Sequence, residues 1–264
     1  MTVDPGWTAL RVPEMERLPG PVVPRFEEMP SHSAFPNHVH RWNQFIHATS
    51  GTLQVSVEGA RHVITPEQAI WVPTGILHDT RAPEGAAFRN LYVVEDPALG
   101  LPRRCAVSAM TPLLRELIQE LAGLEHRGEP PAYGAQIQNL ILEQLRRLTP
   151  QDFHLPWPRS AALQRLCDAL SAAPDDARSL EAWAETLALT PRTLTRRFQR
   201  ETGLTLRAWR QRLRLFKAME WLGNGRGVTE IALDLGYASP SAFTYMFRQE
   251  MGCSPTEWLK GPEP

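Results

Sequence analysis

The order of apolar and polar residues changes character along this chain of 264 residues. From about Pro36 to Glu95, short runs rich in β-branched and aromatic residues alternate with turn residues, as in QFIHAT, GTLQVSV, RHVI, QAIWVP and FRNLYVV. Strands separated by such turns, with no helical period between them, are typical of an antiparallel barrel or sandwich. We therefore expect a β-barrel over residues 25–100, preceded by an irregular, proline-rich arm over residues 1–24.

A helical period begins after Thr111, which has N-cap character and is followed by a proline. Two successive segments then place their apolar residues on one stripe each: Leu114, Leu117, Ile118 and Leu121 in the first, and Ile137, Leu140, Ile141, Leu145 and Leu148 in the second. The pattern predicts two amphipathic connector helices within residues 108–150. Their apolar stripes can pack on the barrel or against a second copy in a homodimer, and the sequence leaves both alternatives open.

The last third of the chain is helical and contains an internal repeat at an offset of 49 residues. TPRTLTRRFQRETGLTLRAWR, which starts at Thr190, aligns with SPSAFTYMFRQEMGCSPTEWL, which starts at Ser239, with six identities in 21 positions. The identities include the proline after each cap, an apolar anchor and a glycine, which are positions that determine where a helix begins, packs and ends. The sequence therefore indicates a duplicated structural unit.

Each copy has the features of a helix–turn–helix motif. In the first, Thr190 caps a helix, Leu194 and Phe198 face inward at i and i+4, and Gly203 ends the helix. The second copy repeats the plan with a turn glycine, Gly236, a cap and two inward aromatic residues: Ser239, Phe243 and Phe247. A short capped helix of this kind can enter the major groove of double-stranded DNA and contact base edges with its N-terminal residues.

The outward faces supply the candidate DNA contacts. In the first motif they are Arg192, Thr193, Thr195, Arg196 and Arg200, and in the second Pro240, Ser241, Thr244 and Tyr245. Arg192 and Arg196 can bond guanine bidentately, whereas phosphate contacts are expected from the three arginines that follow the first motif, Arg207, Arg210 and Arg214. The second helix is nearly neutral, so we expect it to discriminate bases less strongly.

The distribution of charge agrees with a polyanionic partner for the C-terminal part. Up to residue 154 the chain holds 13 Lys and Arg against 17 Asp and Glu, and the remainder holds 15 against 12. Nine cationic residues and one acid lie between Arg192 and Lys217. Such a local field suits nucleic acid, although a charge run by itself also fits a solvated helix face.

At these residues the sequence resembles the AraC/XylS family of bacterial transcription regulators. VTEIALDLGYASPSAFTYMFRQEMGCSP is similar to that family's C-terminal signature, and the resemblance covers about residues 161–260 of a domain that we place at 159–262. It implies two helix–turn–helix units joined by a long helix over about residues 206–222, reading adjacent major-groove segments. Carried over by position, the base-contacting residues are Arg192, Thr195, Arg196, Ser241 and Tyr245. Family members often have a longer polar or basic residue near Tyr245. A plain helical bundle is the alternative that this signature disfavours.

The N-terminal barrel resembles a cupin. The first cupin motif is matched by His38, His40 and Gly51, with Gln44 where the motif has a glutamate. The second is matched by Pro73, Gly75 and His78, but Glu67 and Ala82 replace its first glycine and terminal asparagine. The resemblance implies a pocket inside the barrel, for which we name His38, His40, Gln44, Trp71 and His78.

Residues two apart on a strand share a face, so His38 and His40 are expected to point into the barrel together, where His78 can meet them. Three roles remain open for these histidines: holding a divalent metal (zinc, iron, nickel or manganese) with Gln44 as a fourth ligand, hydrogen-bonding an organic effector directly, or satisfying buried polar groups. Because Gln44 carries no charge, a metal would be held less tightly, and the oxygen chemistry of cupin enzymes is disfavoured.

Three widely spaced cysteines, Cys105, Cys167 and Cys253, show no CxxC or zinc pattern and indicate free thiols in a reducing compartment. No signal segment and no apolar run of about 20 residues is present, so we expect a cytoplasmic protein without a membrane partner.

The sequence as a whole predicts an α+β multidomain protein that regulates transcription. Its function would be sequence-specific DNA binding modulated by a small molecule or metal in the barrel, through a population shift worth about 1–3 kcal/mol. NLYVVEDPALGLPRRCAVSAMTPLLREL is similar to a nitroimidazole-resistance subgroup of the family, which implies repression of a neighbouring transporter gene. RNA polymerase would be a partner if the protein instead activates. The alternatives are a DNA-tethered cupin metalloenzyme of dioxygenase or isomerase type, for which we assign no catalytic residue, and a constitutive DNA-binding protein with a vestigial barrel.

Overall fold

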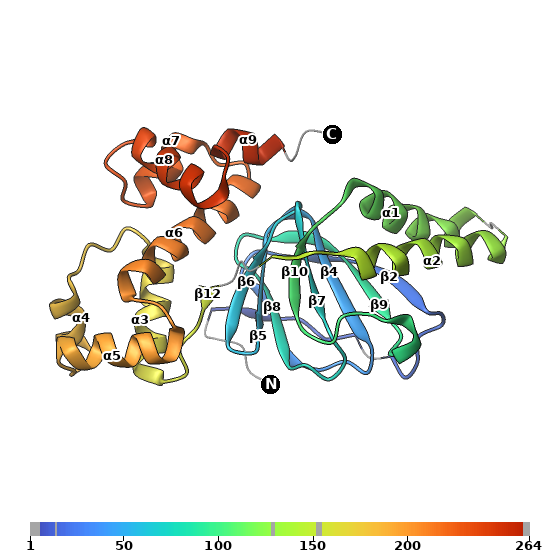
Figure 1. Ribbon diagram of the computed structural model, residues 1–264, viewed down its shortest axis with the longest axis horizontal. Coiled ribbons are helices and arrows are strands. Elements are labelled where there is room, and N and C mark those ends of the chain that lie inside the picture. The colour runs from blue at the N-terminus through green and yellow to red at the C-terminus, as the bar shows by residue number, and fades with distance from the viewer. Residues whose placement is uncertain (1–5, 14, 128–129, 152–154, 261–264) are drawn as a thin grey trace. The chain divides into compact units, whose positions relative to one another are not determined.

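The computed structural model describes residues 6–13, 15–127, 130–151 and 155–260 (Figure 1). Contacts divide the chain into two compact units, with the second starting at residue 154 and also taking in Gly59–Arg61. Parts of the expected arm (residues 1–5 and 14), of the connector (128–129) and of the C-terminal domain (261–262) lie outside the described residues. No helix among the described residues is long and apolar enough to cross a membrane.

The barrel is built from two six-stranded sheets. One has the order β1 (Thr8–Ala9), β3 (Ser33–His38), β8 (His78–Ala82), β5 (Leu53–Val57), β6 (Ala60–Ile64), β12 (Leu155–Pro156). The other has the order β11 (Pro150–Gln151), β10 (Ala106–Ala109), β7 (Gln68–Val72), β4 (Asn43–Gly51), β9 (Ala86–Val93), β2 (Val22–Met29). The expectation of an irregular arm up to residue 24 is therefore wrong at β1 and at the start of β2, and β10 extends the sheet beyond residue 100. A short 3₁₀ helix, η1 (Pro97–Leu99), lies between β9 and β10.

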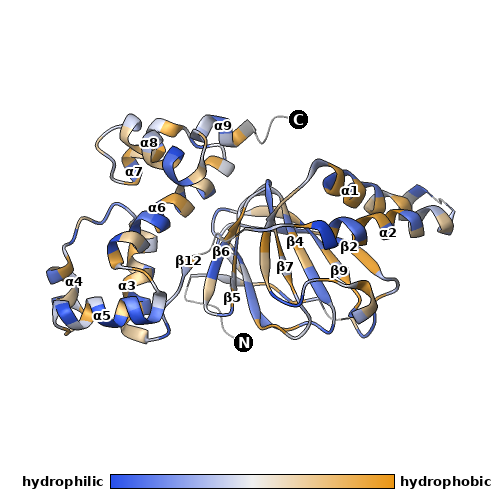
Figure 2. Ribbon diagram, in the orientation of Figure 1, coloured by the Kyte–Doolittle hydropathy of each residue, from blue (hydrophilic) through white to orange (hydrophobic). Residues whose placement is uncertain are grey.

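Alternate residues of the central strands belong to two different apolar clusters. On β7, Ile70 and Val72 join one cluster with Ile46, while Ala69 and Trp71 join another. Figure 2 shows the apolar positions along these strands. The first cluster holds residues from both sheets and fills the barrel interior, whereas the second lies between the β4-containing sheet and the connector helices.

The connector helices α1 (Pro112–Arg127) and α2 (Pro131–Arg147) pack on the barrel, which is one of the two arrangements that the sequence left open. Leu114, Ile118 and Ile141 are essentially inaccessible to solvent in this interface. Leu140, expected on the same stripe, is instead 49% exposed, because Leu142 takes the inward position next to Ile141.

Apart from β12 and Gly59–Arg61, the second unit is helical: α3 (Ala161–Ala172), α4 (Leu180–Thr186), α5 (Pro191–Thr202), α6 (Leu206–Gly223), α7 (Val228–Asp234), α8 (Pro240–Met251) and α9 (Pro255–Lys260). Helices α4 and α5 form the first helix–turn–helix motif, α7 and α8 form the second, and the long α6 joins them (Figure 1). The inward anchors Leu194, Phe198, Phe243 and Phe247 are all fully buried.

Candidate effector site and nucleic-acid interface

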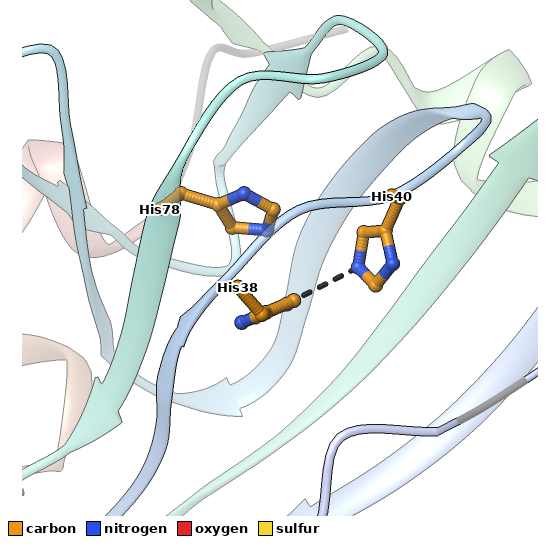
Figure 3. Close-up of side chains that lie close together, drawn as sticks. All are labelled: His38, His40 and His78. Carbon is orange, nitrogen blue, oxygen red and sulfur yellow. Dashed lines mark hydrogen bonds between the residues drawn. The ribbon is translucent and has the colours of Figure 1, made fainter. Parts of the chain in front are cut away.

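Three histidines come together at one end of the barrel (Figure 3). His38 and His78 are register partners across β3 and β8, and His40 follows β3. The Nε2 atoms of His38 and His40 are 3.1 Å apart, and one ligand nitrogen from each histidine lies within 4.8 Å of the others. Two nitrogens bound to one zinc ion lie about 3–3.5 Å apart, because each Zn–N bond is about 2.0–2.1 Å. The nitrogen positions therefore fit a divalent metal after a small adjustment.

His40 is positioned by a loop and not, as expected, by a strand. Strand β3 ends at His38, so the alternation of side chains along a strand does not place His40. Instead, the Gly75 amide donates to the His40 carbonyl at 3.0 Å and holds the loop between β3 and β4. Gly75 has a φ of 75°, a value that residues with a side chain rarely adopt. The glycine of the second cupin motif therefore helps to position a histidine of the first.

Backbone carbonyls fix the orientation of two of the rings. Nδ1 of His38 lies 2.7 Å from the Pro36 carbonyl oxygen, and Nδ1 of His78 lies 2.9 Å from that of Ile76. A hydrogen on each Nδ1 donates to these oxygens and leaves the Nε2 lone pair directed at the cluster. The same bond from the outer nitrogen to a carbonyl is common in histidines that bind metal.

Gln44 provides the fourth polar group of the cluster. Its Oε1 is 2.9 Å from Nε2 of His78, and its Nε2 donates to Oδ1 of Asn90 on β9 at 2.9 Å. Both ring nitrogens of His78 therefore face an acceptor oxygen, although a neutral imidazole has only one N–H. A metal bound by the His78 nitrogen and the Gln44 oxygen would resolve this conflict, and so would a Gln44 amide turned to present its NH₂ group.

Burial keeps the imidazoles neutral and therefore able to act as ligands. It lowers the pKa of His40 to about 3 and that of His78 to about 4, and the neighbouring His38 adds to both shifts. Burial also lowers the pKa of His38. Near pH 7 the cluster thus presents lone pairs rather than positive charge.

An aromatic wall beside His40 was not expected from the sequence. The Trp42 ring stacks on the His40 ring with centroids 5.3 Å apart, and Tyr92 of β9 contacts both. Tyr92 and Asn90 lie two residues apart on a mainly apolar strand. Polar side chains in an otherwise apolar strand are the signal in the sequence that could have indicated Asn90 and Tyr92. A second signal is that a buried Gln44 side chain needs a hydrogen-bond partner.

Trp71 does not belong to the pocket, and its assignment to the effector site is wrong. The side chains of Ile70 and Val72 face the barrel interior, so Trp71 between them points to the opposite side of the sheet. There it packs in the cluster with α1 and α2, and its indole N–H donates to the Pro102 carbonyl at 2.8 Å.

The two helices proposed for DNA contact are built alike in the structure. Thr190 accepts a hydrogen bond from the Thr193 amide, and Ser239 accepts one from the Ala242 amide, each at 3.2 Å. Gly203 and Gly252 end α5 and α8 in the left-handed conformation, at φ of 74° and 76°. These caps fix each helix at both ends and leave its first turns accessible.

The first helix exposes most of its candidate contacts. Arg192, Thr195, Arg196 and Arg200 are exposed, and Thr193 is half-buried. The Thr195 hydroxyl donates to the Pro191 carbonyl, so its oxygen remains available only as an acceptor. Within the part of the chain that the structure describes, Arg192 and Arg196 form no ion pair. Their guanidinium groups are therefore free to meet a ligand.

On the second helix, Ser241 and Tyr245 are exposed, with 69% of Tyr245 accessible, and Pro240 and Thr244 are half-buried. The three arginines expected to meet phosphates differ among themselves. Arg207 is exposed, whereas Arg210 and Arg214 are half-buried and donate to backbone carbonyls of the loop between α3 and α4. The structure thus gives Arg210 and Arg214 intramolecular partners that the sequence did not indicate.

Comparison with known families gives two matches that together cover most of the chain. Residues 20–187 match the model of an AraC-like ligand binding domain, and residues 183–261 match that of a helix-turn-helix domain.

Among curated proteins, the chain is 32% identical to the HTH-type transcriptional regulator NimR of Escherichia coli K12 over 226 residues, which are 85% of this chain and 82% of that protein. It is 42% identical to the transcriptional activator RhaS of Escherichia fergusonii over 87 residues, 33% of this chain and 31% of that one. Among solved structures, it is similar to ToxT from Vibrio cholerae, with 11% identity, coverage of 91% of this chain and 98% of that chain, and a TM-score of 0.38.

Proposed function

Because the chain belongs to the AraC family of transcription regulators, and is a DNA-binding regulator with a domain for a small-molecule ligand, we propose which residues read DNA and which hold the effector. DNA is read by α5 and α8, and the effector binds at the histidine cluster of His38, His40 and His78 with Gln44. The observation that carries the DNA assignment is the pair of capped helices with buried apolar anchors and exposed N-terminal turns. The family consists of transcription regulators, which favours regulation over cupin-type catalysis.

The DNA contacts divide by chemistry. Arg192 and Arg196, on the exposed face of α5, are suited to bidentate bonds with guanine O6 and N7. Ser241 and Tyr245 of α8 contact a second, adjacent DNA segment and discriminate less between bases, because neither side chain has two donors that can bond one base together. Exposed Arg200 and Arg207 contribute contacts to the phosphate backbone.

Replacing Arg196 with alanine is expected to weaken binding to the preferred sequence by about 1–3 kcal/mol and to relax selectivity at one base position. Band-shift titrations against a panel of single-base operator variants would measure both effects. The control is Arg200→Ala, at the far end of the same helix, which should weaken binding to all operators alike. Equal affinity of the Arg196→Ala and wild-type proteins for every operator would contradict the assignment.

For the barrel, we propose a divalent metal held by His38, His40, His78 and the Gln44 oxygen. The support is the convergence of neutral imidazole nitrogens and the lone-pair conflict between His78 and Gln44. The mixed nitrogen and oxygen donors suit zinc, iron, nickel or manganese. The metal would act as an anchor for the effector or as the signal itself, and Trp42 and Tyr92 would form an aromatic wall beside it.

Gln44→Glu tests the role of the fourth ligand. A carboxylate at this position would offset part of the ion's charge, so we expect the metal to bind about tenfold more tightly than in the wild type. Competition with a chelator of known affinity would measure the change, with Gln44→Met as a control that removes the oxygen. Equal metal affinity in all three proteins would show that residue 44 is not a ligand.

A signal from the cluster can reach the connector along β4. This strand carries Gln44 at the cluster and His47, whose Nε2 lies 3.2 Å from the Pro66 carbonyl oxygen. Arg115 of α1 donates to the same oxygen at 3.0 Å and pairs with Glu67 at 3.2 Å. We therefore propose that occupancy of the barrel changes the packing of α1 and shifts the population of DNA-binding conformations.

The remaining parts of the proposal concern partners. We propose a homodimer through the connector helices, where Leu113 and Leu140 stay 53% and 49% exposed. Because the chain is similar to the transcriptional regulator NimR of a bacterium, we propose that it acts on bacterial DNA and therefore in the cytoplasm. Repression of a neighbouring transporter gene is proposed from the subgroup resemblance, with RNA polymerase as the partner if the protein activates. Footprinting on DNA beside its own gene, with and without added metal, would show whether the protein binds there and whether metal changes that binding.

A further inference from the structure

The loop of residues 173–179, which joins α3 to α4, contacts both helix–turn–helix motifs. On the side of the first motif, Arg178 pairs with Asp176 at 2.6 Å, and its guanidinium carbon lies 3.6 Å from the ring centroid of Trp183 in α4. On the side of the second motif, Asp175 lies against Gly236 in the turn between α7 and α8. The loop therefore connects two motifs that are separated in sequence by the whole of α6.

Two arginines of α6 hold this loop in place. Arg210 donates to the Arg178 carbonyl at 3.2 Å and also to the carbonyl of Asp176. One helical turn later, Arg214 donates to the Pro174 carbonyl at 3.0 Å, and its guanidinium lies 5.6 Å from the ring centroid of Tyr237. Three carbonyl groups of the loop, at residues 174, 176 and 178, thus accept hydrogen bonds from side chains of the helix that joins the motifs.

The contact between α6 and the loop gathers positive charge. Arg178, Arg210 and Arg214 lie close together, and among the described residues only Asp176 is an acidic partner bonded to them. Burial and the neighbouring Arg214 charge lower the pKa of Arg210, so holding it there costs free energy. Hydrogen bonds from a charged donor are among the stronger ones and offset this cost.

Gly236 allows the close approach from the other side. Its φ is 75°, and a Cβ at this position would lie 3.2 Å from Cα and 3.3 Å from Cβ of Asp175. A side chain would therefore push the loop away as well as strain the turn. Beyond this contact, Thr195 of α5 and Met246 of α8 line a cavity of about 640 Å³. Open space rather than packed side chains lies between these parts of the two helices.

We propose that the loop 173–179, Arg210, Arg214 and Gly236 form a bridge that fixes the distance and angle between α5 and α8. The bridge thereby determines the spacing of the two DNA segments that the protein accepts. Arg210 and Arg214 are positioning residues that act through the loop, in place of the phosphate contacts expected from the sequence. The inference rests on the proposed reading of DNA by α5 and α8.

The test is a selection of bound sequences from randomised double-stranded DNA by the full chain. The wild type is expected to enrich two short motifs at one fixed separation, because a rigid pair of reading helices tolerates one geometry. In the Arg210→Ala/Arg214→Ala protein, both motifs should persist while their separation becomes variable. Affinity for the wild-type spacing should fall about tenfold, and affinity for spacings changed by one or two base pairs should change less than about threefold.

A second lesion and a control separate positioning from phosphate binding and from loss of fold. Gly236→Ala disturbs the bridge without removing a charge, and it should also broaden the spacing. Arg200→Ala removes an exposed charge outside the bridge, and it should weaken binding at every spacing while the separation stays fixed. Circular dichroism melting verifies that each variant is folded at the assay temperature. If the double arginine variant is not folded, Gly236→Ala carries the test.

The outcomes distinguish this proposal from the proposal that α5 and α8 read DNA. A single unchanged separation in folded bridge variants would overturn the bridge and leave DNA reading by α5 and α8 intact. Uniform weakening at all spacings would identify Arg210 and Arg214 as phosphate contacts and would also overturn it. If the wild type enriches no motif, both proposals fail.

Discussion

Phe198→Ala is expected to destabilise the C-terminal unit by about 3–5 kcal/mol, which is the usual cost of removing a buried phenylalanine from a packed core. The side chain is fully buried and meets the Trp209 ring edge to face, with centroids 5.8 Å apart. It fixes α5 against α6, so its loss should also remove the orientation in which Arg192 and Arg196 face outward. Specific DNA binding is therefore expected to disappear together with part of the stability.

Urea unfolding followed by circular dichroism would measure the loss of stability, and a band shift would measure DNA binding. The matched control is Gln199→Ala, the next residue on α5, whose side chain is exposed. Its stability should stay within about 0.5 kcal/mol of the wild type. A Phe198→Ala protein of unchanged stability would show that this anchor does not hold α5 in place.

His40→Ala is expected to abolish metal binding, because it leaves two imidazoles and the uncharged oxygen of Gln44, a donor set that holds a divalent ion weakly. Wild-type protein purified without an affinity tag should contain near-stoichiometric metal by mass spectrometry, and the variant essentially none. Added metal should raise the melting temperature of the wild type and not of the variant, since a ligand stabilises only a protein that binds it.

His32 provides the control for His40. It is exposed and lies outside the cluster, with a φ of 55°, so asparagine is the replacement that tolerates its backbone conformation. His32→Asn should retain the metal. A wild-type protein that is free of metal and still changes its DNA affinity with an effector would refute the metal proposal. Direct hydrogen bonding of the effector by the histidines would then take its place.

The C-terminal motifs could be predicted almost to the residue, because their determinants are local. A cap, a proline in the first turn, apolar anchors at i and i+4 and a terminal glycine act within one helix, and each of them lies where the repeat placed it. The structure has α5 and α8 ending at Gly203 and Gly252, and α6 spans residues 206–223 against an expected 206–222. The comparisons then confirm the family to which these motifs belong.

In the barrel, the sequence predicted the cluster for a reason that holds only in part. The motif spacing correctly brought His38, His40, Gln44 and His78 together, yet His40 is placed by the Gly75 amide rather than by strand alternation. Trp71 was assigned to the wrong face because the face on which a residue of β7 lies depends on how that strand is paired. A shift of one residue along a strand exchanges the two faces, and only the paired sheet fixes that choice.

The sequence by itself determined the elements, the duplicated reading unit, and the three histidines and Gln44 that gather in the barrel. Tertiary structure alone decided which side chains meet: Asn90 with Gln44, Trp42 with His40, and Arg210 and Arg214 with a loop more than 30 residues earlier. The physical reason is the range of the interactions. Capping and helical periodicity act over a few residues, whereas a long polar side chain takes whichever partner the packed chain brings within reach.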